Sequence, residues 1–268
     1  MSLARKLKKL KKIILNSKSA AIAYSAGADS TLLLYIASKL LPKNNIIAVT
    51  ANSALYPKRE LSSAEKIAES FEVRHKVVII QQLKRKVFSS NQVNRCYFCK
   101  KELFAALKKI ARQHKLNNVF DASNLSDKKD FRPGERAKKE LGVRSPLQEA
   151  GINKKEVREL SRLLKLKTWD KPSSPCLASR IPYGTGITVD ILKRIDYAEE
   201  ALNKMGFKQA RLRHYGRMCR LEVLKQDIPG LVLAKKRVVD KLKKLGYNYV
   251  TVDLEGYRTG SMNEMLKI

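Results

Sequence analysis

Three short segments of the sequence combine residue types that can carry chemistry. The first, SAGADST at residues 25–31, is a run of small and hydroxyl residues placed between an apolar segment and a predicted helix. Small residues let the backbone approach an anion closely, and the N-terminus of the following helix directs N–H groups and its positive dipole end at that anion. Neither the Gly-Lys-Ser/Thr spacing nor the Gly-x-Gly-x-x-Gly spacing is present. The run predicts a phosphate-binding turn of another kind.

Asp29 has two possible roles in this turn. A carboxylate at a helix N-terminus can be only a cap. The same carboxylate also suits holding Mg²⁺ against a pyrophosphate, because Mg²⁺ is typically bound by one or two carboxylates together with phosphate oxygens. The spacing of the run favours phosphate binding over a plain turn.

The second segment is the pair Cys96 and Cys99, which stands at the start of a basic stretch. Such a pair can be a redox dithiol, half of a zinc site or part of an iron–sulfur site. Neither a second Cys-x-x-Cys pair nor a pair of histidines exists in the sequence to complete a zinc-finger pattern. Two idle thiols are the alternative without chemistry.

The third segment is the proline-rich stretch around Cys176, which also contains Ser179 and Arg180. A cysteine in a stiff loop beside an arginine can act as a thiolate, although buried loop thiols are common. Together with Cys96 and Cys99, it could bind three irons of a [4Fe–4S] cube and leave the fourth iron open. Cys219, the last cysteine, lies in a predicted strand and is expected in the core.

The elements that must position these segments alternate between strands and helices. Predicted strands cover 20–24, 45–50, 73–79 and 118–122, and predicted helices cover 30–41, 58–71, 102–114 and 153–165. This alternation predicts an α/β fold with a doubly wound parallel sheet that is covered on both faces. Before the first strand, Leu3, Leu7, Leu10 and Ile14 share one face of a predicted surface helix whose other face carries lysines.

The stretch 168–188 contains three prolines and two glycines, which predicts a loop or linker. Helices at 189–205 and 227–245 and strands at 209–214, 218–223 and 248–254 follow it. We therefore predict two domains: 1–180, with the phosphate-binding turn, and 181–268, a smaller α+β unit for substrate binding and oligomerisation.

Composition limits the class of protein. The chain has 268 residues, 44% of them hydrophobic and 30% charged, which is enough to build a core. No apolar run approaches the roughly 18 residues that span a bilayer, so no membrane partner is expected. Four unevenly spaced cysteines fit a reducing compartment and predict a cytoplasmic protein. The formal charge of +31 indicates an anionic partner, such as a nucleotide or nucleic acid, or a background adapted to a salt-rich or hot cytoplasm.

Residues 25–30 resemble the PP-loop, usually Ser-Gly-Gly-x-Asp-Ser, of the ATP pyrophosphatases, with Ala26 in place of the first glycine. Further blocks resemble the LarE-type proteins, ATP-dependent sulfur transferases that mature the nickel-pincer cofactor of lactate racemase. These blocks are DASN (121–124), RPGER (132–136), LGVRSPL (141–147), TWDKPSSPCLASRIPYGT (168–185) and EGYRTGSMN (255–263). The resemblance covers nearly the whole chain after the first predicted helix.

The resemblance implies a two-stage reaction. ATP, with Mg²⁺, adenylates a carboxylate of pyridinium-3,5-biscarboxylic acid mononucleotide and pyrophosphate leaves. A sulfur nucleophile then displaces AMP and leaves a thiocarboxylate. The implied ATP-binding residues are Ser25, Gly27, Ala28, Asp29 and Ser30, with the nucleobase on the backbone near Ala51.

The resemblance also implies roles for the cysteines. In one branch of the family, the cysteine that matches Cys176 gives up its own sulfur. In another branch, cysteines that match Cys96, Cys99 and Cys176 hold a [4Fe–4S] cluster, and we favour this branch. The sulfur donor is then unidentified, and catalysis is assigned to Cys176 and Asp29.

Charged residues of the second domain match a substrate-phosphate or metal site of the family. They are Glu199, Arg211 and Arg213, with Ser179 and Arg180 nearby; salt bridges, a cap or a solvated face are the alternatives. Asp121 and Asn124 follow a predicted strand end, where open parallel sheets bind their ligands. Members of the family tend to assemble through the C-terminal domain, which implies a homo-oligomer.

Two other functions remain open on the sequence. One is a PP-loop enzyme that thiolates a tRNA base, which the positive charge would suit. The sequence has no zinc-ribbon set and no dedicated RNA-binding module that would support it. The other is a non-catalytic nucleotide-binding or iron–sulfur carrier protein.

Overall fold

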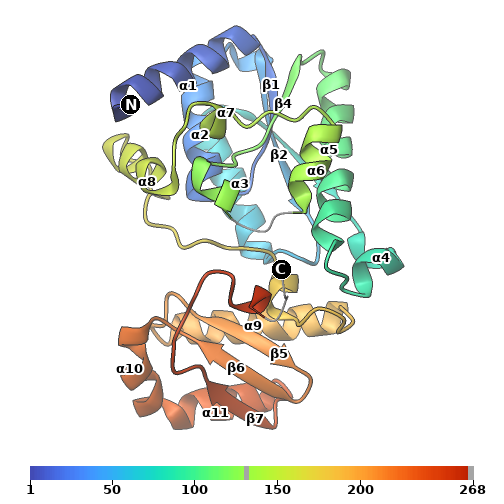
Figure 1. Ribbon diagram of the computed structural model, residues 1–268, viewed down its shortest axis with the longest axis vertical. Helices are drawn as coiled ribbons and strands as arrows, with labels where there is room; N and C mark the ends of the chain where they lie inside the picture. The colour runs from blue at the N-terminus through green and yellow to red at the C-terminus, as the bar shows by residue number, and fades with distance from the viewer. Residues whose placement is uncertain (130–132, 265–268) are drawn as a thin grey trace. The chain divides into compact units, whose positions relative to one another are not determined.

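The computed structural model describes residues 1–129 and 133–264, and its chain forms two compact units (Figure 1). Unit 1 comprises Met1–Ser53, Lys58–Gln82 and Asn94–Ser173, and unit 2 comprises Ala54–Pro57, Leu83–Val93 and Ser174–Ile268. Arg132, the first residue of the RPGER block, lies outside the described residues.

Unit 1 is built on a sheet of four parallel strands. They are β1 (Ala20–Ala23), β2 (Ile46–Asn52), β3 (Arg74–Ile79) and β4 (Asn118–Phe120), in the order β3-β2-β1-β4. The chain extends the sheet from β1 in one direction and then returns to add β4 on the other side of β1. This is the predicted doubly wound arrangement, and the strand order reverses between β1 and β4, where open sheets of this class bind ligands.

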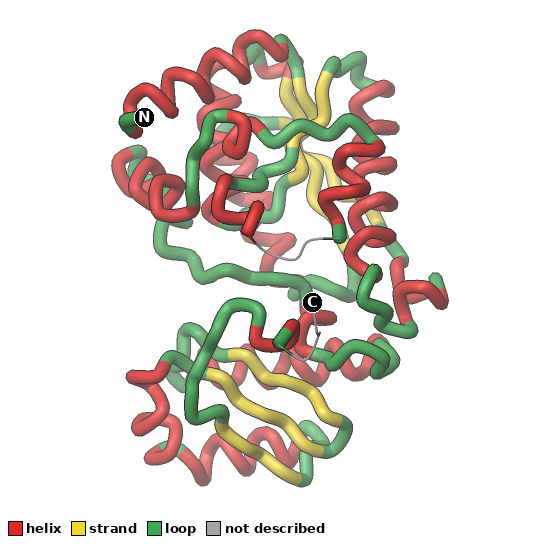
Figure 2. The backbone as a smooth tube through the Cα atoms, viewed as in Figure 1, coloured by secondary structure: helices red, strands yellow, loops and turns green. Residues whose placement is uncertain are grey.

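Helices cover both faces of this sheet (Figures 1 and 2). On one face, Ala20 and Ile22 of β1 pack in a core with α1 (Leu3–Ser17), α2 (Ala28–Leu40), α3 (Lys58–Ser70) and α8 (Lys154–Leu163). On the other face, Ala21 of β1 packs against α5 (Arg95–Gln113). Successive strand residues point to opposite faces, so a strand that is apolar at every position is buried from both sides.

The N-terminal helix packs as its spacing predicts. Leu10 and Ile14 of α1 are fully buried, and Leu3 and Leu7 contact the same core from its edge. The largest change from the predicted boundaries is in α5, which begins at Arg95 rather than at residue 102. Two short helices that the sequence did not indicate, α6 (Gly134–Glu140) and α7 (Pro146–Glu149), follow β4.

Unit 2 contains a three-stranded sheet and several helices. Strands β5 (Arg211–Tyr215) and β6 (Met218–Glu222) are antiparallel, and β7 (Tyr249–Val252) lies parallel to β6. The helices are α4 (Lys86–Ser89), α9 (Val189–Lys204), α10 (Ile228–Leu233) and α11 (Lys235–Lys244). The predicted single helix 227–245 is wrong, because the chain leaves helical geometry at Ala234, where ψ is 7°. Alanine is the strongest helix former, so its presence there did not signal the break.

Short segments of the first half of the chain belong to unit 2 because they bond to the stretch around Cys176. Leu177 N–H donates to the Leu55 carbonyl at 2.9 Å, and Ile187 N–H donates to the Ser89 carbonyl at 2.8 Å. The buried amide of Asn91 donates to the Pro182 carbonyl at 2.7 Å. The domain boundary at residue 180 stays a prediction, whereas the packing units change at residue 174. Among the described helices, none has the length and apolarity to cross a membrane.

Candidate nucleotide and sulfur-transfer site

The turn after β1 is held by the hydroxyls of its own serines. Ser25 N–H donates to Ser30 Oγ at 3.3 Å, and Ser30 Oγ donates to the Gly27 carbonyl at 3.2 Å. Gly27 is the N-cap of α2, and no side chain of the described residues caps that helix. The N–H groups of a first helical turn have no acceptor inside the helix. The N-terminus of α2 can therefore donate to an anion, as the sequence predicts.

Ala26 differs from the glycine of the resembled motif, and its backbone shows why glycine suits the position. Its φ of 53° lies in the left-handed region, and its methyl group is fully buried. The Ala26 carbonyl accepts a hydrogen bond from Lys171 Nζ at 3.0 Å, and Lys171 also pairs with Glu60 at 2.7 Å. Lys171, which is far from the turn in the sequence, thus stabilises the turn through the Ala26 carbonyl.

Asp29 lies in the first turn of α2, where the strand order reverses. Its Oδ1 accepts a hydrogen bond of 3.0 Å from Asn124 Nδ2, and its Oδ2 contacts Lys154 Nζ. Asn124 follows β4 and is only 2% exposed, so it joins the loop after β4 to the turn after β1. Asn124 thus lies at the sheet edge where the sequence analysis expects ligands, and its role in binding stays a prediction.

Asp121, the other predicted strand-end residue, has a network of its own. Its carboxylate accepts from Ser123 Oγ at 2.6 Å and from Ser145 Oγ at 2.5 Å. The buried ammonium of Lys138 lies 3.9 Å from it. Asp121 is therefore engaged in joining α6 and α7 to the sheet edge.

The predicted nucleobase edge is connected to the cysteine pair. Ala51 lies near the end of β2, and Ser53 follows the strand; Ser53 Oγ donates to Gln82 Oε1 at 2.6 Å. The amide nitrogen of Gln82 in turn donates to Cys99 Sγ at 3.6 Å. Gln82 is 3% exposed, so its amide bridges the two groups away from bulk water. Sequence analysis missed Gln82, because no motif marks a lone glutamine.

Cys96 and Cys99 lie in the first two turns of α5, three residues apart, so both side chains are on one side of the helix. Both side chains are half-buried, and neither sulfur is in a disulfide. Within the described ranges, no group of three or more His, Cys, Asp and Glu side chains is placed to hold a metal ion. The pair belongs to unit 1, whereas Cys176 belongs to unit 2.

Cys176 is a free, half-buried thiol directly before the 3-10 turn Leu177–Arg180. Its carbonyl accepts from Ser179 N–H at 2.9 Å and from Arg180 Nη1 at 3.1 Å. Arg180 Nη1 also donates to the Pro175 carbonyl at 2.7 Å and to Ser179 Oγ at 2.9 Å. Arg180 therefore holds the loop that carries the thiol.

The other edge of the Arg180 guanidinium makes a two-point ion pair with Glu199, through Nε and Nη2 at 2.9 Å each. Burial alone lowers the pKa of Arg180, but the charge and hydrogen bonds of Glu199 raise it above its usual value. Burial raises the pKa of Glu199, and Arg180 and Arg211 bring it below its usual value. Both side chains are buried, with exposed fractions of 2% for Arg180 and 9% for Glu199. Direct contact of Arg180 with a phosphate stays a prediction.

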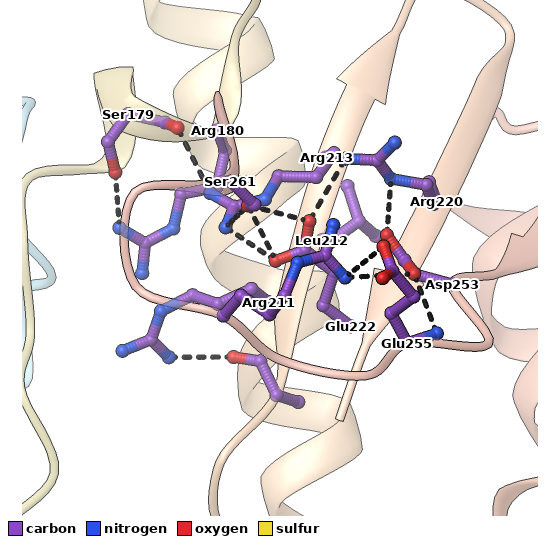
Figure 3. Close-up of polar contacts among 12 residues, drawn as sticks. Ser179, Arg180, Arg211, Leu212, Arg213, Arg220, Glu222, Asp253, Glu255 and Ser261 are labelled. Carbon is purple, nitrogen blue, oxygen red and sulfur yellow. Dashed lines mark hydrogen bonds and ion pairs between the residues drawn. The ribbon is translucent and has the colours of Figure 1, made fainter. Parts of the chain in front are cut away.

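Arg211 and Arg213 come from β5 and lie beside this pair (Figure 3). Arg213 donates to Glu222 at 2.5 Å, to Ser261 Oγ at 2.9 Å and to the Ser179 carbonyl at 3.1 Å. Its Nε is buried and has no hydrogen-bond partner within the described ranges. Burial, together with the charge of Arg180, lowers the pKa of Arg211.

Among the described side chains that are buried in this cluster, guanidinium groups outnumber carboxylates. Three buried guanidiniums, of Arg180, Arg211 and Arg213, share the region with two buried carboxylates, Glu199 and Glu222. Glu222 is also shared with Arg220 at 3.0 Å. Unit 2 thus brings together the residues predicted to bind the substrate phosphate: Ser179, Arg180, Glu199, Arg211 and Arg213.

Comparisons with known proteins identify relatives of this chain. A family model described as NAD synthase matches residues 4–122, which contain the turn after β1 and its flanking strands. Pyridinium-3,5-bisthiocarboxylic acid mononucleotide synthase of Lactiplantibacillus plantarum is 36% identical over 245 residues, which cover 91% of this chain and 89% of that protein.

Two uncharacterised proteins are also similar over the full length. One, from Synechocystis sp., is 40% identical over 266 residues, covering 98% of this chain and 99% of that protein. The other, from Methanocaldococcus jannaschii, is 29% identical over 262 residues, covering 97% of this chain and 100% of that protein. The similarity therefore includes both units.

Proposed function

From the premise that this chain belongs to the LarE-type family of PP-loop, ATP-dependent sulfur transferases, we propose that it thiolates pyridinium-3,5-biscarboxylic acid mononucleotide. The name of the relative from Lactiplantibacillus plantarum gives the bisthiocarboxylic acid mononucleotide as the product. The pyridinium mononucleotide has two carboxylates that can react and a phosphate that can be bound.

The first step needs ATP because a carboxylate is a poor electrophile. Transfer of AMP to the carboxylate makes an acyl-adenylate with a good leaving group, and pyrophosphate is released. Members of this family use ATP with Mg²⁺. The donor set fits Mg²⁺, since Asp29 offers a half-buried carboxylate beside the N-terminus of α2. This pairing of a carboxylate and an uncapped helix N-terminus is the observation that carries the proposal.

The second step needs a sulfur nucleophile. Thiolates are the ligands that iron–sulfur clusters take, and Cys96, Cys99 and Cys176 are partly exposed and form no disulfide. A [4Fe–4S] cluster on these residues would supply a sulfide from an unidentified donor. Cys96 and Cys99 would hold it from α5, and Arg180 would hold the Cys176 loop in place. Transfer of the sulfur of Cys176 itself is the alternative route.

The arginines of unit 2 would bind the phosphate of the mononucleotide. Arg211 and Arg213 place two further guanidinium groups beside Arg180, which Glu199 binds through Nε and Nη2. Guanidinium groups bind phosphate oxygens through paired N–H donors. We also propose that the protein acts as a homo-oligomer in the cytoplasm.

The test is the formation of AMP and pyrophosphate by the anaerobically purified protein, given ATP, Mg²⁺ and the biscarboxylic acid mononucleotide. We expect both products in the wild type and neither in Asp29→Ala, whose circular dichroism should be unchanged. The absence of pyrophosphate in the wild type would contradict the proposed reaction and favour a non-catalytic nucleotide carrier.

The route of the sulfur is tested in the same preparation. Iron, sulfide and visible absorbance that disappear in Cys96→Ala would support the cluster. If Cys96→Ala instead transfers sulfur once per chain and loses mass at Cys176, the sacrificial route holds.

A further inference from the structure

Lys154 contacts Asp29, although the sequence analysis did not name Lys154 as a site residue. Lys154 Nζ contacts Asp29 Oδ2, while Asn124 donates to Asp29 Oδ1 at 3.0 Å. The two charged side chains are 33% and 23% exposed, so solvent reaches both. The carboxylate proposed to hold Mg²⁺ is thus in contact with a cation of the protein itself.

We propose that Lys154 competes with Mg²⁺ for Asp29 and, once displaced by the metal, binds the phosphates of ATP as a catalytic residue. This inference rests on the proposed ATP-binding role of the turn after β1. It adds a residue that no motif marks, from a helix 125 positions further along the chain.

The competition follows from the two oxygens of the carboxylate. Asn124 is buried and engages Oδ1 as a hydrogen-bond donor, which leaves Oδ2 as the oxygen better placed to bind a metal. Lys154 Nζ contacts that same oxygen. An ammonium group and a divalent cation repel one another at such a separation, so Mg²⁺ at Oδ2 requires Lys154 to move.

The backbone of Lys154 is fixed, so only its side chain has to move. Lys154 is the first residue of α8, which Asn153 and Glu156 close with a capping box. Its N–H donates to Ser126 Oγ at 3.2 Å. A lysine carries a compact charge on a flexible four-carbon stem, so the ammonium can exchange one anion for another while the helix stays in place.

After displacement from Asp29, the Lys154 ammonium group would bind the phosphates of ATP. The proposed phosphate position lies at the N-terminus of α2, whose first turn contains Asp29 itself. An ammonium group beside the transferring phosphates stabilises the negative charge that develops on the departing pyrophosphate. Lys154 would therefore weaken Mg²⁺ binding at Asp29 and accelerate adenylation, two effects that can be measured separately.

The test variant is Lys154→Met, which keeps the stem and removes the charge, with Lys155→Met at the neighbouring exposed residue as its control. Binding of α,β-methylene-ATP, which cannot be cleaved at that bond, is followed by calorimetry at increasing Mg²⁺. We expect Lys154→Met to reach half-saturation at about 3- to 10-fold lower Mg²⁺ than the wild type. A structural role alone would leave that concentration unchanged or raise it, and either result overturns the competition.

The second measurement is single-turnover pyrophosphate release at saturating Mg²⁺. We expect Lys154→Met to slow it about 10²-fold or more, and Lys154→Arg to recover part of the rate. A rate equal to that of Lys155→Met overturns the catalytic role. Equal melting temperatures of the variants show that folding is intact.

The two hypotheses fail in different ways. If the wild type and Asp29→Asn bind the analogue with the same Mg²⁺ dependence, the metal role of Asp29 is wrong and Lys154 has nothing to compete for. If only Asp29→Asn changes that dependence, Asp29 holds the metal and the inference about Lys154 is wrong.

Discussion

The methyl group and the backbone φ of Ala26 determine which residues the phosphate turn accepts at this position. The left-handed φ of 53° costs a non-glycine residue about 1–2 kcal/mol, whereas burial of the methyl group returns about 0.8 kcal/mol. Burial of the methyl group therefore offsets roughly half of the backbone cost. This explains why alanine can stand where the resembled motif has glycine.

Substitutions at Ala26 should therefore have opposite outcomes. We expect Ala26→Gly to change the free energy of unfolding by less than about 1 kcal/mol. Ala26→Val should lower it by about 2 kcal/mol or more, because a β-branched side chain is strained at positive φ. Urea denaturation measures both. A valine variant as stable as the wild type would contradict the left-handed geometry.

Gln82 is a second residue whose role only the structure reveals. Its buried amide accepts from Ser53 Oγ and donates to Cys99 Sγ, so one side chain joins the end of β2 to the cysteine pair. A donated N–H bond stabilises negative charge on sulfur.

We expect Gln82→Leu to slow alkylation of Cys99 several-fold while leaving alkylation of Cys96 nearly unchanged. The leucine removes both hydrogen bonds of the amide, to Ser53 Oγ and to Cys99 Sγ, and only the second of them acts on a cysteine. Mass spectrometry of the protein treated with limiting iodoacetamide gives both rates. Equal slowing at the two cysteines would indicate a general change in packing instead.

At the scale of elements, strand pairing places the arginine cluster. Arg211 and Arg213 alternate with Leu212 along β5, so the arginines point to one face of the sheet and the leucine to the other. Arg213 lies opposite Arg220 of β6, and Glu222 of β6 serves both. The charges of the proposed phosphate site are thus set by the register of two strands.

The opposite face of the same sheet carries a titratable group. His214 of β5 is 3% exposed, and its Nδ1 lies 3.0 Å from the Tyr247 hydroxyl. Burial lowers the pKa of His214 below its usual 6.5, and the charge of Arg194 adds to the effect. The unfolded chain therefore takes up a proton at His214 at higher pH than the folded protein does.

Stability should follow that difference in proton uptake. As pH falls below 6.5, the unfolded state gains the proton first, so the free energy of unfolding decreases until the folded pKa is reached. We expect His214→Phe to flatten this decrease relative to the wild type between about pH 6.5 and pH 5. Urea melts across that range test it, and an unchanged slope would show that His214 is not the group involved.

At the scale of the whole molecule, the charge of +31 is the property that the sulfur-transfer proposal explains least. The mononucleotide and ATP are small anions and need only local positive charge. The alternative function, thiolation of tRNA, would use the charge more broadly. RNA contacts release counterions, so such binding weakens steeply with salt.

We expect binding of tRNA to be non-specific and no thiolated base to form with ATP and a sulfide source. Gel shifts at increasing salt, followed by nucleoside analysis of the recovered tRNA, measure both properties. Formation of a thiolated nucleoside would favour the alternative function over modification of the pyridinium mononucleotide.

The α/β class, the doubly wound sheet and the family could all be predicted from the amino-acid sequence. The run of small residues at 25–31, the buried strands and the block around Cys176 are patterns of neighbouring residues. Such local patterns can be recognised in the sequence alone. The predicted strands therefore lie close to their observed bounds. The break at Ala234 was missed, because alanine carries no signal for leaving a helix.

The pairing of charged side chains, in contrast, could not be predicted before the fold was known. Lys154, Lys171 and Gln82 contact the turn after β1 or the cysteine pair from 17 to 145 positions away along the chain. Lysines are abundant throughout this sequence, so nothing in their types or spacing distinguishes these from solvated ones. Ion pairs and buried hydrogen bonds depend on distances of about 3 Å, and only the packing of strands and helices sets such distances.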